Sequence, residues 1–304
     1  MTECERIVNE GIVNADFLKE EVRNGFLVDI KRKKLWTILI DLYLQFEGVC
    51  KKHKLKWYVM FGSALGAVRH GGFIPWDDDF DIVMPRSDYN KFIKLSDEFC
   101  YPYFLQTPYT DPEFYFSFTR LRNSNTTAII QKFQWQQMNH GIYIDVFPLD
   151  KWSVEDNNIY KVIGNLIRDN STYMRMKYPK PDARDKKMIS EYQGKDPLWT
   201  YEEIQRLSMS YSEEFTKHVS IPVLQIYPYK KNVFDIKDFE YQKKQKFEFF
   251  DVPIPNGYKN ILRQVYGDYM EFPPVAQRGI WHSGIFIDVD KPYKSYMLLN
   301  EVDL

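Results

Sequence analysis

The stretch that decides the fold, residues 61–86, reads FGSALGAVRHGGFIPWDDDFDIVMPR. It combines a Gly-Ser pair, a glycine-rich loop and consecutive aspartates that end in the alternation Asp79-Phe80-Asp81-Ile82. Residues two apart on a β-strand point to the same face, so we expect Asp79 and Asp81 to project together while Phe80 and Ile82 enter the core. Two carboxylates held in this way favour a hard divalent cation.

The bulk composition is that of a globular chain without a charge bias. The 304 residues are 44% hydrophobic, enough to bury a sizeable core. Lysine plus arginine (41) nearly balances aspartate plus glutamate (42), so we expect no nucleic-acid partner and at most peripheral membrane association. The three cysteines, Cys4, Cys50 and Cys100, form no CxxC motif, which fits a reducing compartment. No signal peptide or spanning helix is visible, so the sequence predicts a cytoplasmic protein, with the inner face of the membrane as an alternative site.

A strand and a small-residue turn precede the acidic residues. Residues 55–61 (LKWYVMF) are rich in aromatic and branched side chains and run into Gly62 and Ser63, where a helix is predicted to start. A helix amino terminus presents N–H groups and a favourable dipole to an anion, so this pair is a candidate phosphate cradle. The alternative is an ordinary N-cap serine.

Three arginines are candidates for binding phosphates. Arg69 precedes two glycines in the loop 69–76 (RHGGFIPW), where a close-approaching backbone and a cation would suit a pyrophosphate. Arg120 and Arg122 are two residues apart in the run FSFTRLR, so both guanidinium groups should lie on one face of a strand. They would bind the phosphates of a nucleotide or, equally, belong to a solvated face.

A third carboxylate comes from a second hydrophobic strand. Asp145 lies between Ile144 and Val146 in residues 141–150, which read GIYIDVFPLD. An unpaired carboxylate in such a strand is costly, so we expect a metal ion or an arginine as its partner. A capping or salt-bridging aspartate is the alternative.

Carboxylates on adjacent strands, beside a Gly-Ser turn that leads into a helix, indicate a metal-dependent transferase acting on phosphate esters. Mg²⁺ takes octahedral oxygen coordination and leaves positions for substrate phosphates. Asp77, Asp79 and Asp81 also match the opening of a calcium-binding loop, but Ile82 stands where that loop needs glycine. Calcium is therefore disfavoured.

Three segments resemble the LicD family, whose more distant relatives include the fukutin-related protein. They are GSALGAVRHGGFIPWDDDFDI, GIYIDVFPLD, and YGDYMEFPP with an arginine and a histidine following. The resemblance implies a nucleotidyltransferase-like fold of the polymerase-β type. It also implies transfer of a phosphorylated alcohol, usually phosphocholine from CDP-choline, to a cell-surface glycan such as lipopolysaccharide or teichoic acid, or to a lipid-linked precursor. The zinc-binding cysteines of the fukutin-related protein have no counterpart here.

The resemblance further implies roles for individual residues. Asp79 and Asp81 would be ligands of Mg²⁺, with Mn²⁺ as a second option, and Asp77 would lie close to the same ion. The Gly62-Ser63 pair would face the pyrophosphate of the donor. Asp145 would complete the site.

Phosphoryl-transfer chemistry suggests how such a site would act. Arg69 and Mg²⁺ would neutralise the CDP diphosphate, and attack of an acceptor hydroxyl at the β-phosphorus would expel CMP. Asp145 would orient or deprotonate that hydroxyl, or serve as a metal ligand. His282 would contact a phosphate or the acceptor, or else be a hydrogen-bonded structural residue.

We expect an α+β fold with a mixed sheet flanked by helices. Residues 1–150 should form a nucleotidyltransferase-like core, residues 151–222 a helical lobe, and residues 223–304 a segment that completes the catalytic domain and its site. Within these parts the sequence predicts an amphipathic helix at 29–53 and a strand at 246–253.

Two other functions remain open. A nucleotidyltransferase would use the same carboxylates but attack the α-phosphorus of a nucleoside triphosphate, joining the nucleotide to a sugar or alcohol phosphate and releasing pyrophosphate. A non-catalytic binding protein would keep the fold without turnover. In such a protein the metal-ligating carboxylates would be the first residues to be lost, and here the acidic set is intact.

Overall fold

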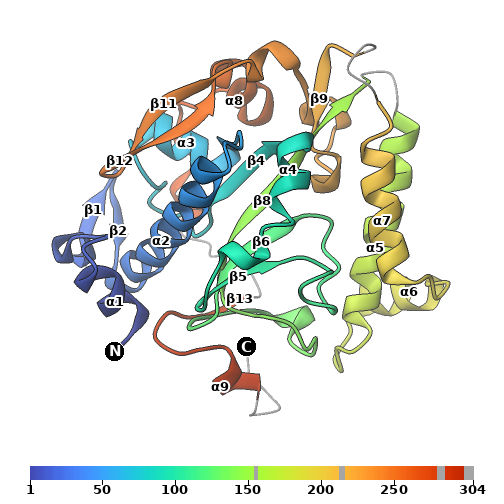
Figure 1. Ribbon diagram of the computed structural model, residues 1–304, viewed down its shortest axis with the longest axis horizontal. Coiled ribbons are helices and arrows are strands. Elements are labelled where there is room, and N and C mark those ends of the chain that lie inside the picture. The colour runs from blue at the N-terminus through green and yellow to red at the C-terminus, as the bar shows by residue number, and fades with distance from the viewer. Residues whose placement is uncertain (154–156, 212–215, 279–284, 298–304) are drawn as a thin grey trace.

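A computed structural model describes residues 1–153, 157–211, 216–278 and 285–297 (Figure 1). The helices are α1 Glu3–Asn9, α2 Ile30–Lys52, α3 Phe61–Arg69, α4 Arg86–Phe92, α5 Asn157–Arg175, α6 Ala183–Glu191, α7 Pro197–Ser208, α8 Tyr258–Tyr266 and α9 Lys294–Met297. The strands are β1 Glu21–Arg23, β2 Phe26–Val28, β3 Tyr58–Val59, β4 Asp81–Pro85, β5 Tyr103–Gln106, β6 Thr119–Asn123, β7 Thr127–Ile130, β8 Ile142–Trp152, β9 His218–Ser220, β10 Val233–Asp235, β11 Gln242–Phe247, β12 Phe250–Pro255 and β13 Ile285–Asp288.

A seven-stranded mixed sheet is organised around the long strand β8. β8 pairs in parallel with β4, antiparallel with β6, and at its end antiparallel with β9. β3, β5 and β10 then extend the sheet beside β4, β6 and β9 respectively. The predicted α+β fold, a mixed sheet flanked by helices, is confirmed.

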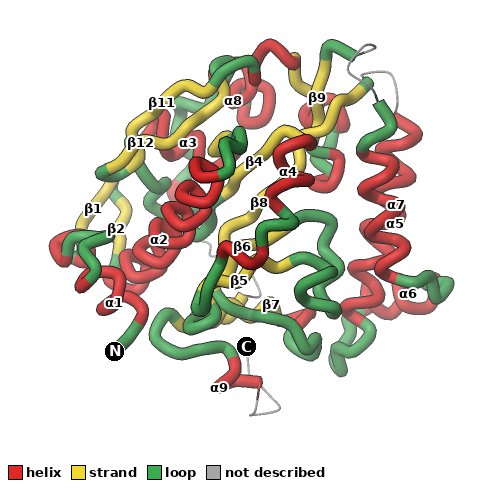
Figure 2. The backbone as a smooth tube through the Cα atoms, in the orientation of Figure 1, coloured by secondary structure: helices red, strands yellow, loops and turns green. Residues whose placement is uncertain are grey.

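The helix α2 covers one face of this sheet (Figure 2). Its N-cap Asp29 accepts a hydrogen bond from the N–H of Arg32, and the helix predicted at 29–53 is confirmed. Trp36 of α2 shares one hydrophobic cluster with Ile82 of β4 and Val146 of β8. This cluster is the main core.

The helices α5, α6 and α7 lie within the range predicted for the helical lobe. Tyr160 of α5 and Ile204 of α7 share a second hydrophobic cluster with Val83 and Phe147, which point away from α2 on β4 and β8. The lobe is thus attached to the sheet through apolar contacts. None of the described helices has the length and hydropathy of a membrane span.

Two local predictions were right only in part. The strand expected at 55–61 is reduced to β3, because α3 already begins at Phe61. The strand expected at 246–253 is instead a hairpin of β11 and β12 that turns at Glu248, which has a positive φ of 52°. Distant contacts stabilise this turn, since the Glu248 carboxylate pairs with Arg23 and accepts from the N–H of Phe73.

Candidate active site

Two of the predicted carboxylates, Asp81 and Asp145, lie next to each other on neighbouring strands of the sheet. Asp81 of β4 is in parallel register with Asp145 of β8, so their side chains share one face. Phe80 and Ile82 are buried, as the alternation predicts. Asp79, however, lies in the loop before β4, which begins at Asp81.

Two helices anchor the acidic turn that precedes β4. The carbonyl of Asp77 accepts hydrogen bonds from Nη1 of Arg32 at 2.8 Å and from Nε1 of Trp36 at 3.1 Å, both in α2. From α3, the hydroxyl of Ser63 accepts from the N–H of Asp81 at 2.9 Å. The sequence offered no sign of the Arg32 contact, because the charge run 31–34 is typical of a solvated helix end.

Negative charge is concentrated at this turn. Burial and repulsion from Asp77, Asp81, Asp78 and Asp145 hold the pKa of Asp79 well above its usual range. In the described part of the chain, no three His, Cys, Asp or Glu side chains are already gathered closely enough to hold a metal ion. Oxygen ligands and mutual repulsion nevertheless fit a hard cation, so ligation by Asp77, Asp79 and Asp81 stays a prediction.

Arg120 forms an ion pair with Asp145, which fits both the expected arginine partner and the alternative of a salt-bridging aspartate. Its Nε donates to Oδ1 of Asp145 at 2.7 Å, and only 4% of the Arg120 surface is exposed. The guanidinium carbon lies 3.8 Å from the centroid of the Tyr143 ring. Nη1 of Arg120 is buried and has no hydrogen-bond partner among the described residues. An orphaned donor of this kind favours binding of an anionic oxygen.

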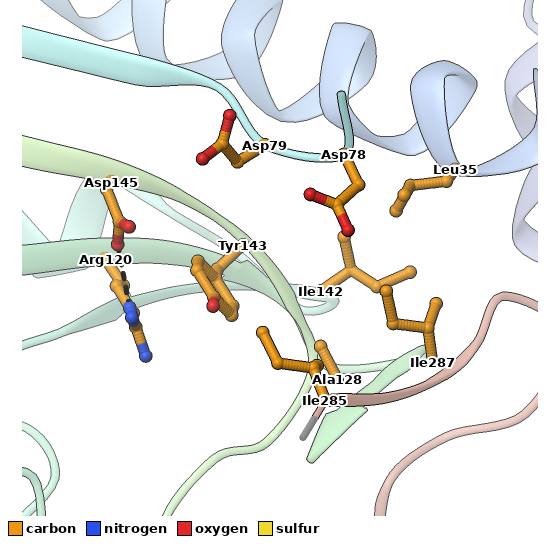
Figure 3. A pocket seen from close by; sticks show the side chains of 10 residues that line it. All are labelled: Leu35, Asp78, Asp79, Arg120, Ala128, Ile142, Tyr143, Asp145, Ile285 and Ile287. Carbon is orange, nitrogen blue, oxygen red and sulfur yellow. Dashed lines mark hydrogen bonds and ion pairs between the residues drawn. The ribbon is translucent and has the colours of Figure 1, made fainter. Parts of the chain in front are cut away.

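A cavity of about 160 Å³ opens beside these groups (Figure 3). The side chains of Asp79, Asp145 and Arg120 lie on one side of it, and aliphatic side chains lie on the other. Two of the aliphatic residues, Ile285 and Ile287, belong to β13, which pairs with β7. The sequence did not predict this strand, so its contribution to the site was missed.

The amino terminus of α3 meets the acidic turn at Gly62. A Cβ atom on this residue would lie 2.8 Å from Oδ2 of Asp77, so glycine lets that carboxylate keep its position. The hydroxyl of Ser63 is already used by the N–H of Asp81. The structure therefore brings this pair to the carboxylates, and contact with a phosphate stays a prediction.

Arg69 lines a second cavity, of about 430 Å³, together with Asp77 and Tyr266. Its Nη1 donates to the carbonyls of Tyr269 and Glu271, both at 2.8 Å, and so ties the segment after α8 to α3. Tyr266 was not among the predicted site residues. Although 42% of the Tyr266 surface is exposed, desolvation of the phenol and, after it, the negative charges of the acidic turn raise the pKa of Tyr266.

The other two predicted residues do not join this group. Arg122 does lie on the same strand face as Arg120, since both contact the Tyr143 ring, but it is fully buried. It donates to Oε1 of Gln106 and, at 2.5 Å, to the carbonyl of Gly141. An enclosed guanidinium offers no surface to a substrate, so neither the phosphate contact nor the solvated face expected for Arg122 fits the structure. His282 lies outside the described residues.

The mixed sheet flanked by helices agrees with the nucleotidyltransferase-like fold that the motifs implied. Residues 54–189 match the family LicD/FKTN/FKRP, nucleotidyltransferase domain. Residues 54–189 are therefore assigned to this nucleotidyltransferase domain, and the resemblance predicted from the motifs is confirmed over that part of the chain.

Among the curated proteins that the chain resembles, one is named LicD and two are uncharacterised. The chain is 22% identical to the lipopolysaccharide cholinephosphotransferase LicD of Haemophilus influenzae over 243 residues, 78% of this chain and 90% of that protein. It is 31% identical to an uncharacterised protein of Rickettsia prowazekii over 134 residues, 44% of this chain and 45% of that protein. A 70-residue match to an uncharacterised protein of Rickettsia typhi is 42% identical and covers 23% of this chain and 22% of that protein.

Proposed function

We propose that this protein is a Mg²⁺-dependent phosphotransferase that moves a phosphorylated alcohol from a CDP-alcohol to a hydroxyl of a cell-surface glycan or its precursor, releasing CMP. The observation that carries the proposal is the register of Asp81 with Asp145, next to the acidic turn and the buried Arg120. The preferred donor is CDP-choline, because the Haemophilus influenzae relative is a cholinephosphotransferase.

The acidic turn would hold the cation. Asp77, Asp79 and Asp81 would be the ligands, and the bound Mg²⁺ would supply positive charge that neutralises the donor diphosphate. The amino terminus of α3, at Gly62 and Ser63, would present its N–H groups and dipole to the same diphosphate.

Arg120 and Asp145 would serve the reacting groups. Nη1 of Arg120, buried and without a hydrogen-bond partner in the described part of the chain, would donate to a phosphoryl oxygen. The acceptor hydroxyl would attack the β-phosphorus, the bond from this phosphorus to the bridging oxygen would break, and CMP would leave. If Asp145 acts as the general base, it would take the proton of the acceptor hydroxyl. If it is a further ligand of Mg²⁺, that proton would pass to water.

Product analysis tests this function. The protein is incubated with Mg²⁺, with poly(glycerol phosphate) as a hydroxyl-bearing acceptor and, separately, with CDP-choline, CDP-ribitol, CDP-glycerol and CTP, and nucleotide products are separated by chromatography. CMP from a CDP-alcohol supports the proposal, whereas pyrophosphate from CTP would show a nucleotidyltransferase. A ligand that raises the melting temperature without any product would show a binding protein.

A further inference from the structure

A basic groove of about 480 Å³ lies between α5, α6 and the segment 225–227. Four of the residues that line it are cationic: Lys161, Arg168, Arg175 and Arg184. None of its lining residues, all of them in the described part of the chain, carries a carboxylate. The groove is therefore strongly basic in a chain whose net charge is −1.

Three of these cations form a row along one face of α5. Lys161, Arg168 and Arg175 follow one another at intervals of seven residues, which returns nearly to the same side of a helix. At 1.5 Å per residue the row extends over about 21 Å. It can contact several anionic groups along a chain, whereas a single phosphate would reach only one or two of the cations.

Most of this charge is not compensated within the described residues. Arg175 pairs with Asp185 at 2.9 Å, whereas Lys161, Arg168 and Arg184 make no ion pair with any described side chain. Nε of Arg175 is buried and lacks a hydrogen-bond partner. Like charges gathered in one groove repel each other, and a bound polyanion would relieve this repulsion.

We propose that the groove binds an anionic glycan chain, namely the phosphate- or carboxylate-bearing part of the acceptor. That this glycan is the acceptor of the transfer reaction rests on the proposed function. A groove fits an extended chain, whereas helices that lie on a membrane present an apolar face to it. Tyr227, 61% exposed and also in the lining, adds an aromatic face beside the row of cations.

Binding of a labelled poly(glycerol phosphate) oligomer of about ten phosphates tests the groove, because each neutralised phosphate adds to affinity and to its salt dependence. Fluorescence anisotropy is measured on the full chain without donor nucleotide. The double variant Lys161→Ala/Arg168→Ala should bind at least tenfold more weakly, with a less steep salt dependence. The control Lys186→Ala/Lys187→Ala removes equal charge from exposed positions outside the groove and should bind within twofold of wild type.

Three results would overturn the proposal. The first is an equal loss of oligomer affinity in both double variants, and the second is displacement of the oligomer by inorganic phosphate at the same total phosphate concentration. The third is groove-dependent binding of phosphatidylglycerol vesicles but not of the oligomer. The test is separate from that of the transfer reaction. Oligomer binding without CMP release from any CDP-alcohol would support the proposed groove and contradict the proposed function. CMP release without groove-dependent binding would support the proposed function and contradict the proposed groove.

Discussion

Asp145 and Arg120 face each other across neighbouring antiparallel strands, and Nε of Arg120 donates to Oδ1 of Asp145 at 2.7 Å. On the other side of β8, Asp145 is in register with Asp81. The third carboxylate of the site is thus held between a cation and a second carboxylate. Its position depends on both.

The Arg120→Ala variant should be strongly destabilised. Removing one member of a buried ion pair leaves the other charge unpaired, which costs about 3–5 kcal/mol of unfolding free energy. Chemical denaturation measures this loss. The control Lys52→Ala removes a pair with Glu98 in which the lysine is 64% exposed, and it should cost less than about 1 kcal/mol. Equal losses in the two variants would contradict the structural importance of the Arg120 pair.

The Asp79→Asn and Asp81→Asn variants should lose Mg²⁺-dependent CMP release by at least about a hundredfold, because electrostatic contacts to the reacting phosphates are large terms in catalysis. Circular dichroism should show an intact fold. The control Asp97→Asn changes an exposed aspartate outside the site and should keep wild-type turnover. Activity within a few-fold of wild type in either site variant would reject the acidic turn as the metal site.

The stability of Asp79→Asn should depend on pH in the presence of a chelator. The folded-state pKa of Asp79 is raised by burial and repulsion above the usual value of 3.8, so the native state holds this proton more tightly than the unfolded state. Ionisation of Asp79 therefore costs stability as the pH rises above the unfolded value. The melting temperature of Asp79→Asn should equal that of wild type near pH 4 and exceed it increasingly as the pH rises, until Asp79 of the folded wild type is ionised. A gain that is the same at every pH would contradict this explanation.

The Asp145→Asn variant separates two roles. Loss of turnover with unchanged affinity for the CDP-alcohol would identify Asp145 as the general base, whereas loss of affinity as well would identify a metal ligand. Isothermal titration with Mg²⁺ present gives the affinity, and CMP release gives the turnover. Wild-type values for both would remove Asp145 from the site.

The Gly62→Ala variant should displace a carboxylate without removing one. Its new Cβ would lie 2.8 Å from Oδ2 of Asp77, so this side chain must shift, and small misplacements in an active site cost about tenfold to a hundredfold in rate. The control Gly48→Ala places a Cβ in open space on α2. That control should keep activity and gain about 0.5–1 kcal/mol of stability, since alanine favours a helix. Matching activities in the two variants would show that the close approach to Asp77 does not matter.

Much of the site was readable from local patterns. The alternation at Asp79-Phe80-Asp81-Ile82 predicted which side chains leave the core, and the isolated carboxylate of Asp145 predicted an arginine or a metal ion as its partner. Period-two and period-3.6 patterns depend only on the chain geometry of strands and helices, so a single sequence reveals them. The same patterns failed at residues 246–253, where an apolar run concealed a turn.

By itself, the sequence determined the class of fold, the family motifs and the placing of Asp81 and Asp145 on adjacent strands. The tertiary structure alone decided that Arg120 pairs with Asp145 while Arg122 is enclosed, that Arg32 anchors Asp77, and that β13 closes the cavity. The physical reason is that periodicity assigns each side chain to a face of its own element. Which residues from distant parts of the chain meet at that face depends on how the elements pack together.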